Sequence, residues 1–123
     1  MTPSEFHRGT ANHLAGLAAE MQVARHFADR GLPVRERRWR GPGGEIDLVC
    51  GGPEGLVFVE VKKARDHAAA LARVSGRQLD RIRLSAAAYA AGMPRGSLTE
   101  MRIDLALVDA AGRIEVIENA TMH

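Results

Sequence analysis

The chain has 123 residues and a formal net charge of +2, and 46% of its residues are hydrophobic. This length and composition suit one small globular domain over residues 1–123 and exclude a disordered, low-complexity chain; we expect residues 1–11 to be flexible. The single cysteine, Cys50, excludes an intrachain disulfide and a cysteine cage for a metal, and we interpret it as a spare thiol. No apolar run is long enough to cross a bilayer and the first residues lack the layout of a secretory signal, so we expect a cytoplasmic protein with no membrane partner.

The first predicted element is a helix from about Asn12 to Arg30. Its predicted apolar stripe comprises Leu14, Leu17, Ala18, Met21, Ala24, Phe27 and Ala28. Glu20 projects at the edge of this stripe. It is therefore either a solvated rim residue or a carboxylate aimed at a cation, and the second alternative implies a metal ion or Lys62 as its partner.

A basic run, Arg35-Glu36-Arg37-Arg38-Trp39-Arg40, follows the predicted helix. Its arginines suit phosphate groups, and its tryptophan suits stacking on a base or a sugar. Such a run is more often a solvated loop or an edge strand. The candidate nucleic-acid contacts, here and further along the chain, are Arg37, Arg38, Trp39, Arg40, Lys63, Arg77 and Arg81.

Two apolar runs of strand length, residues 44–49 and 56–62, are separated by the glycine-rich segment 50–55. This pattern predicts an antiparallel hairpin. We expect Val49 to face Leu56 across the turn, a register that fixes which side chains meet further along the two strands.

In that register Glu45, Asp47, Glu60 and Lys62 share one face near the strand ends. Carboxylates placed so close together repel one another and favour a cation between them. Hard oxygen ligands without a set of histidines or cysteines favour Mg²⁺ or Mn²⁺ over zinc. The alternative interpretation is an exposed ladder of glutamate and lysine on an ordinary hairpin.

Asp47 and the segment Glu60-Val61-Lys62 resemble the motif of the PD-(D/E)XK nuclease superfamily, in which an acidic residue and E-x-K bind a metal and activate water. From about Leu17 to Ala120 the chain is also similar to the YraN-like family of uncharacterised bacterial proteins, whose fold resembles that of archaeal Holliday-junction resolvases. The segments that support this likeness are Ala19-Glu20-Met21-Gln22-Val23, Arg38-Trp39-Arg40, Gly44 to Leu48, Val57 to Lys62 and Asn119-Ala120.

The resemblance implies a restriction-endonuclease-like α/β sandwich, with a mixed central β-sheet flanked by helices. It also implies a metal-dependent endonuclease that hydrolyses phosphodiester bonds in nucleic acid, with DNA favoured, and that works as a homodimer if it cuts junctions. The implied catalytic residues are Asp47, Glu60, Lys62, Glu20, Glu45 and Gln78, and the implied ligands of Mg²⁺ or Mn²⁺ are Asp47, Glu60, Glu45 and the Val61 carbonyl. Lys62 would orient or deprotonate water, and Glu45 and Glu20 would tune the site or hold a second ion.

Three positions depart from the family pattern. Ala19 stands where the family has glycine, Arg38 where it has asparagine, and Gln78 where it commonly has lysine. Ser75 to Gln78 fits a capping box at the start of a second helix, so Gln78 is either a helix cap or a residue of the site.

The C-terminal part alternates in hydrophobicity over residues 101–109 and again, after a glycine turn, over residues 113–118. These segments predict two more strands, and we interpret Asp104 on the first of them as structural. The order of helix, hairpin, helix and two strands predicts an α/β sandwich with a mixed sheet and helices on its faces.

Two other functions stay open. The chain is alternatively a non-catalytic nucleic-acid-binding module on a nuclease fold, or a small structural or protein-interaction domain whose acidic cluster pairs with Lys62, Lys63 and Arg40. Metal dependence distinguishes the nuclease from both, and a steep loss of DNA affinity with salt distinguishes the second from the third.

Overall fold

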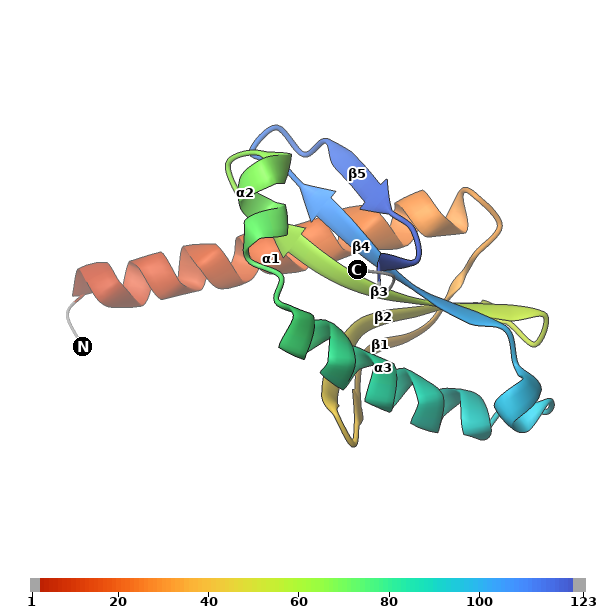
Figure 1. The fold of residues 1–123 in the computed structure, drawn as a ribbon. Helices are drawn as coiled ribbons and strands as arrows, with labels where there is room; N and C mark the ends of the chain where they lie inside the picture. The colour runs from red at the N-terminus through yellow and green to blue at the C-terminus, as the bar shows by residue number, and fades with distance from the viewer. Residues whose placement is uncertain (1–2, 121–123) are drawn as a thin grey trace.

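The predicted hairpin and the two predicted C-terminal strands belong to one sheet in the computed structural model, which describes residues 3–120 and the side chains from residue 14 on (Figure 1). In chain order the elements are α1 (Pro3–Ala28), β1 (Val34–Gly41), β2 (Gly44–Gly52), β3 (Gly55–Lys63), α2 (His67–Ala72), α3 (Gly76–Ala91), a short 3-10 helix η1 (Gly96–Leu98), β4 (Met101–Val108) and β5 (Ile114–Ile117). The sheet has the order β1-β2-β3-β4-β5, and all neighbours are antiparallel except β3 and β4. The segment containing α2 and α3 connects those two parallel strands.

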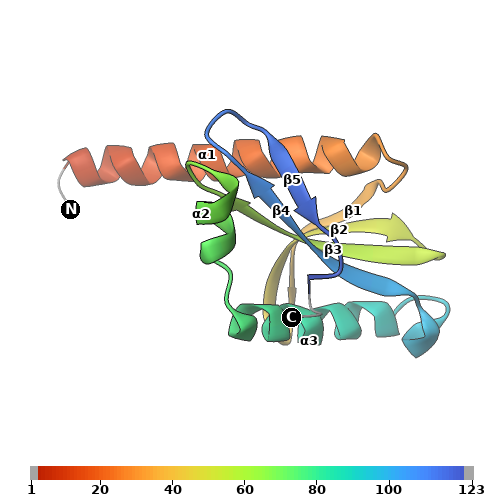
Figure 2. The same cartoon turned by 45° about the horizontal axis from the view of Figure 1, so that its top comes forward.

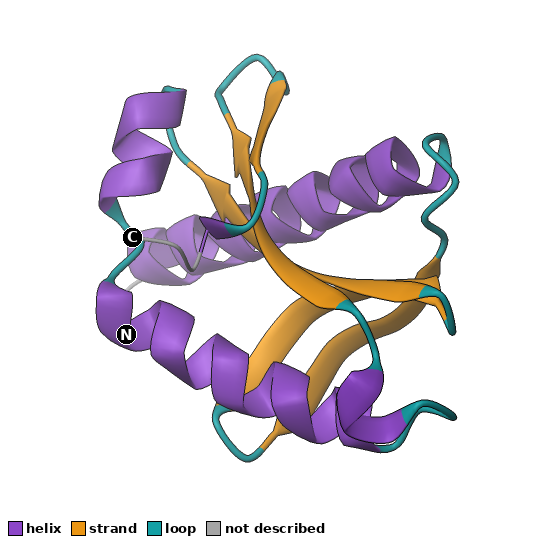
Figure 3. Cartoon of the chain, turned by 45° about the vertical axis from the view of Figure 1, so that its right-hand side comes forward, coloured by secondary structure: helices purple, strands orange, loops and turns teal. Residues whose placement is uncertain are grey.

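Helices cover both faces of this sheet. α1 lies across one face and α3 across the other, and α2 packs near the end of β4 (Figures 1 and 2). The twist of the sheet between the helices is visible in Figure 3. The predicted fold class, a mixed α/β sandwich of the restriction-endonuclease-like kind, is confirmed. No helix in residues 3–120 is long and apolar enough to span a membrane.

The first helix differs from its prediction in both extent and orientation. It begins at Pro3 rather than near Asn12. Its buried side is formed by Ala19, Val23, Ala24 and Phe27. Four residues of the predicted stripe are instead exposed, namely Leu14 (59%), Ala18, Met21 (66%) and Ala28. Apolar residues occur around most of this helix, so periodicity alone selected a stripe rotated away from the true one.

Near the candidate site, the alternation of side chains between the two faces of the sheet is broken in β1 and β2. Leu48 packs in the core beneath α1, whereas Ile46, only two residues away, packs in the core beneath α3. Residues two apart in a regular strand share a face, so β2 departs from regular alternation between these two residues, although its register with β1 is unshifted from Glu36 to Gly41. Arg38 lies at the same point of β1 with a φ of 51°, a left-handed conformation that is uncommon for residues other than glycine. The irregularity places Asp47 where β2 crosses from one core to the other.

The register of β2 and β3 also differs from the prediction. Val49 pairs with Phe58 rather than with Leu56, and the loop narrows to the two residues between Gly52 and Gly55. Gly51 extends the strand with a φ of 100°, which a residue with a side chain would rarely adopt. A shift of two residues keeps the paired residues of β2, from Leu48 to Gly52, on their predicted faces but moves Glu60 toward Asp47.

The turn between β1 and β2 is fixed to α3. The Gly43 N–H donates to Ser85 Oγ at 2.9 Å, and Ser85 Oγ donates to the Gly44 carbonyl at 2.9 Å. A β-carbon on Gly43 would overlap the Arg81 carbonyl. The hairpin tip therefore needs glycine to reach the helix this closely.

A buried carboxylate secures the C-terminal end. Asp104 is fully buried on β4 and accepts from Arg102 Nε at 3.0 and 3.2 Å. It also accepts from the Asn119 N–H at 3.1 Å, which ties the segment after β5 to the sheet. These contacts fit the structural interpretation of Asp104.

Candidate metal and nucleic-acid site

Glu60 is the centre of the candidate site. It points from the central strand β3 toward the start of α3 and is only 5% exposed. Gln78 Nε2 donates to its Oε2 at 2.6 Å, and Lys62 Nζ lies 3.7 Å from the same oxygen. Alternation along β3 explains why Glu60 and Lys62 share this face.

Asp47 reaches the E-x-K segment through the backbone. Its Oδ2 accepts from the Val61 N–H at 2.8 Å, just beyond Leu48 and Val59, the last paired residues of β2 and β3. The side chain thus replaces a ladder hydrogen bond where the two strands separate. Asp47 therefore lies beside Val61 and Glu60, as predicted, by a contact that strand alternation does not describe.

Burial makes the Glu60 carboxylate costly to ionise. Burial first, and the negative charge of Asp47 second, raise the pKa of Glu60 to about 8 from its ordinary value of 4.5, while the charge of Lys62 acts in the opposite direction. Its Oε1 is buried without a hydrogen-bond partner among the described residues. A buried carboxylate oxygen left unpaired is an unusual feature that calls for a cation or a proton.

The donors present fit a hard divalent cation with few protein ligands. In residues 14–120 no three side chains of histidine, cysteine, aspartate or glutamate gather closely enough to hold a metal by themselves, so Asp47 and Glu60 form a pair. Mg²⁺ typically takes one or two carboxylates and completes its shell with water and substrate phosphates. A pair of carboxylates with one unpaired oxygen suits that chemistry.

Two other predicted acids pair with arginines of β1. Glu20 is partly buried, and its Oε2 accepts from Arg38 Nη2 at 3.0 Å and Nε at 3.2 Å. Its observed ion-pair partner is therefore Arg38, whereas the sequence offered a metal ion or Lys62. Glu45 is exposed and lies 3.9 Å from Arg40, and it does not join the Asp47–Glu60 pair in a group of three. The irregular β1 backbone that brings Arg38 toward α1 explains the first difference.

Gln78 follows the capping-box prediction only in part. Ser75 is the N-cap of α3 and accepts from the Gln78 N–H at 3.1 Å. The Gln78 side chain does not reach back to the helix start but donates to Glu60. The alternative in which the Gln78 side chain caps the helix is therefore wrong. The buried Glu60 carboxyl gives this side chain a stronger acceptor.

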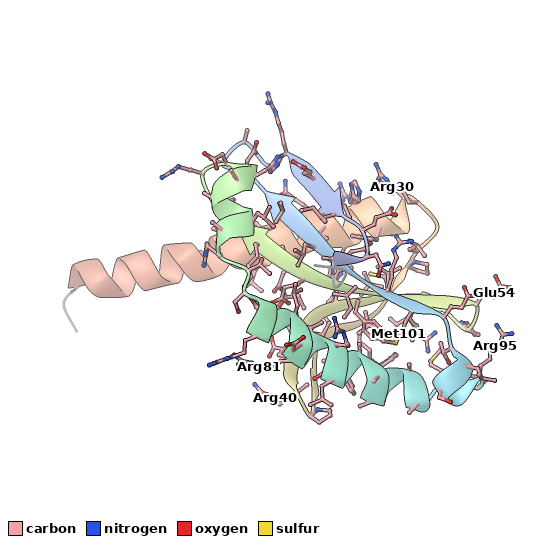
Figure 4. The ribbon with its side chains drawn as sticks, viewed as in Figure 1. Arg30, Arg40, Glu54, Arg81, Arg95 and Met101 are labelled. Carbon is pink, nitrogen blue, oxygen red and sulfur yellow. The ribbon has the colours of Figure 1, made fainter. Side chains whose placement is uncertain are left out.

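The predicted basic contacts separate into different surroundings. Trp39 is half-buried and packs edge-on against Tyr89, with ring centroids 5.1 Å apart, so it belongs to the α3 core rather than to an open stacking surface. Arg38 is engaged with Glu20. The remaining five, Arg37, Arg40, Lys63, Arg77 and Arg81, are exposed or half-exposed. Figure 4 labels Arg40 and Arg81 on the α3 side, near the β1–β2 turn.

Sequence reasoning missed a basic groove beside the site. This groove, of about 530 Å³, is lined by the cationic side chains Lys62, Lys63, Arg65 and Arg73 and by small residues of α1 and of the turn after β4. The run of three cations in Lys62-Lys63-Ala64-Arg65 was the available signal. A larger groove of about 730 Å³ lies at the other end of β3, around the β2–β3 turn, away from Glu60.

Cys50 takes no part in this chemistry. It is fully buried in the core beneath α1, and burial raises the pKa of its thiol to about 12. A thiol held protonated is neither a nucleophile nor a metal ligand at neutral pH.

The mixed sheet with α1 and α3 on opposite faces makes this a restriction-endonuclease-like α/β domain, with an acidic pair and a lysine where β2 and β3 separate. The profile of Uncharacterised protein family UPF0102 matches residues 19–108. The chain belongs to this family, which confirms the YraN-like membership predicted from its motifs.

Relatives in the same family match almost the whole chain. A UPF0102 protein of Cereibacter sphaeroides (strain ATCC 17029) is 54% identical over 112 residues, which cover 91% of this chain and 96% of the relative. One from Ruegeria pomeroyi is 51% identical over 116 residues, which cover 94% of each chain. One from Ruegeria sp. (strain TM1040) is 44% identical over 123 residues, which cover 100% of this chain and 99% of the relative.

Proposed function

We propose that this protein is a metal-dependent endonuclease that hydrolyses phosphodiester bonds in nucleic acid, with DNA favoured. The observation that supports this most strongly is the buried Glu60 carboxyl, which has one unpaired oxygen and lies beside Asp47 and Lys62. A carboxyl kept at this cost in the core is typical of functional sites.

Asp47, Glu60 and the Val61 carbonyl would hold Mg²⁺ or Mn²⁺. When bound, such an ion would offset the charge that develops on the phosphoryl oxygens and would make its water more acidic. Lys62 Nζ, 3.7 Å from Glu60 Oε2, would orient or deprotonate the attacking water. Gln78 Nε2 fixes the Glu60 side chain by its 2.6 Å hydrogen bond to Oε2, a positioning role that leaves Oε1 without a partner.

A nuclease assay tests the proposal directly. Fluorescently labelled single-stranded DNA, duplex DNA, a four-way junction and RNA are incubated with the protein in Mg²⁺ or Mn²⁺ and, separately, in EDTA. We expect cleavage of at least one substrate only with metal, and a loss of at least about a hundredfold in Glu60→Gln. Glu54→Gln, in the exposed β2–β3 turn, is the matched control and should retain activity. Unchanged cleavage in Glu60→Gln, or no cleavage of any substrate, would overturn the proposal.

A non-catalytic nucleic-acid-binding module is the second candidate. It is favoured by the convergence of only two carboxylates among the described residues and by the pairing of Glu20 with Arg38. Such a module would bind DNA equally in EDTA and in Mg²⁺ and would cleave none of the four substrates.

A further inference from the structure

The charged side chains that line the basic groove beside Lys62 are all positive. Each of its four titratable lining residues, Lys62, Lys63, Arg65 and Arg73, is cationic. Lys62 also contacts Glu60, so the groove begins at the candidate site itself. A concave surface with one sign of charge concentrates ligands of the opposite sign.

Two further carboxylates, Asp66 and Asp109, adjoin groove residues in the chain. Asp66 caps α2 by accepting from the Ala69 N–H at 2.7 Å, and it also lies 3.4 Å from Arg65 Nε. Asp109 accepts from the Ala111 and Arg113 N–H groups at 2.9 and 2.8 Å. Backbone hydrogen bonds lower the pKa of both acids, so they stay charged, but the four cationic side chains that line the groove outnumber them.

The shape of the groove suits a sugar-phosphate chain. Its α1 wall is made of Ala15 and Gly16, which carry at most a methyl group and so narrow the groove little. Arg73 Nη1 donates to the Lys63 carbonyl at 2.8 Å, which fixes one guanidinium at the groove wall. No aromatic side chain lines this groove within the described part of the chain. Cations without stacking partners contact phosphates and sugars rather than bases.

We propose that the groove binds the phosphate backbone of one nucleic-acid strand next to the scissile phosphate, independently of base sequence, with Lys63, Arg65 and Arg73 as its contacts. The inference rests on the proposed function, because it assigns the path that the substrate strand takes once it leaves the candidate site at Glu60 and Lys62. It places the strand between α1 and α2 rather than along the Arg37–Arg40 run, where Trp39 and Arg38 are already engaged.

Gly16 offers a test with little risk to folding. A β-carbon at Gly16 would meet no atom within 4 Å, and both glutamate and glutamine are better helix formers than glycine. Gly16→Glu therefore puts a negative charge into the groove, and Gly16→Gln is its neutral control of the same size. Arg65→Gln removes one groove cation. Arg95→Gln removes an exposed arginine beyond the far end of α3 (Figure 4).

Binding of a fluorescein-labelled oligothymidylate of about 20 nucleotides is measured by anisotropy in EDTA over a salt series. We expect Gly16→Glu to bind about tenfold more weakly than Gly16→Gln, and Arg65→Gln to bind about threefold more weakly than wild type with a salt slope smaller by about 1. Arg95→Gln should match wild type. The groove assignment is overturned if Gly16→Glu and Gly16→Gln bind alike, if Arg95→Gln loses as much as Arg65→Gln, or if wild type does not bind.

The same variants separate this inference from the proposed nuclease activity. If only the groove assignment is wrong, Gly16→Glu and Gly16→Gln cleave equally well in Mg²⁺. If only the nuclease assignment is wrong, no protein cleaves, yet the difference between the two Gly16 variants in EDTA persists.

Discussion

Replacing Glu60 by glutamine removes an ionisable group from the core and keeps the shape of the side chain. In the unfolded chain this carboxyl loses its proton near its ordinary pKa of 4.5, whereas in the folded protein the pKa is raised to about 8. Between these values the native state holds a proton that the unfolded state has released. The stabilising contribution is therefore complete below about pH 4.5 and is lost as the pH rises through about 8.

The size of the effect follows from the gap between the two pKa values. Each pKa unit corresponds to about 1.4 kcal/mol, so the wild type should lose up to roughly 3 kcal/mol relative to Glu60→Gln between about pH 5.5 and about pH 8. The glutamine amide can still accept from Gln78 Nε2, so the hydrogen bond seen at 2.6 Å need not be lost.

Urea unfolding in EDTA measures this difference. The free energy of unfolding is determined for wild type and Glu60→Gln at several pH values, and the difference between the two proteins removes all titrations that they share. Glu54→Gln, in the exposed turn, should follow wild type at every pH. If the difference in the free energy of unfolding between wild type and Glu60→Gln stays constant across this pH range, the argument that burial raises the pKa of Glu60 is refuted.

Three further predictions concern the scaffold, each checked by urea unfolding. Gly43→Ala should lower the free energy of unfolding by about 2 kcal/mol, because its methyl group meets the Arg81 carbonyl. Gly52→Ala, whose β-carbon meets nothing within 4 Å, is the control. Equal losses in the two variants would contradict this prediction. Asp104→Ala should cost about 3 kcal/mol, since it removes the buried partner of the Arg102 side chain and of a backbone N–H; a loss below about 1 kcal/mol would show that the pair is dispensable. Arg38→Asn should be more stable than Arg38→Ala, because asparagine tolerates a φ of 51°, and the reverse order would mean that backbone strain there is unimportant.

Strand alternation and turn signals predicted the core of the candidate site. The alternation around Glu60 and Lys62 is evident in the sequence, because the residues that alternate with them, Val57, Val59 and Val61, are all valines. The register was two residues out, since Gly51 can extend the strand in a conformation that other residues avoid. A shift of two residues does not exchange the faces of the paired residues, so Glu60 still came near Asp47, whereas Glu45 lies on Arg40 instead.

Partners set by tertiary placement could not be predicted in this way. The Arg38–Glu20 pair depends on a left-handed residue in β1 and on the rotation of α1, and neither has a periodic signal in the sequence. The basic groove depends on Ala15 and Gly16 lying near Arg73, the residue that directly follows α2, and no periodic pattern in the sequence indicates that placement. Trp39 reads as a surface residue within a basic run, yet its ring packs against Tyr89 from α3.

Binding of Mn²⁺, followed by calorimetry at about pH 8.5, tests most directly whether Asp47 and Glu60 hold a metal. We predict that wild type binds the ion, that Asp47→Asn and Glu60→Gln lose binding by at least about tenfold, and that Glu54→Gln binds as wild type does. Each variant's thermal unfolding without metal is measured in parallel, so that a loss of binding is not confused with a loss of folding. Equal binding by wild type and Glu60→Gln, or no binding by folded wild type, would contradict the assignment of this carboxyl pair as a metal site.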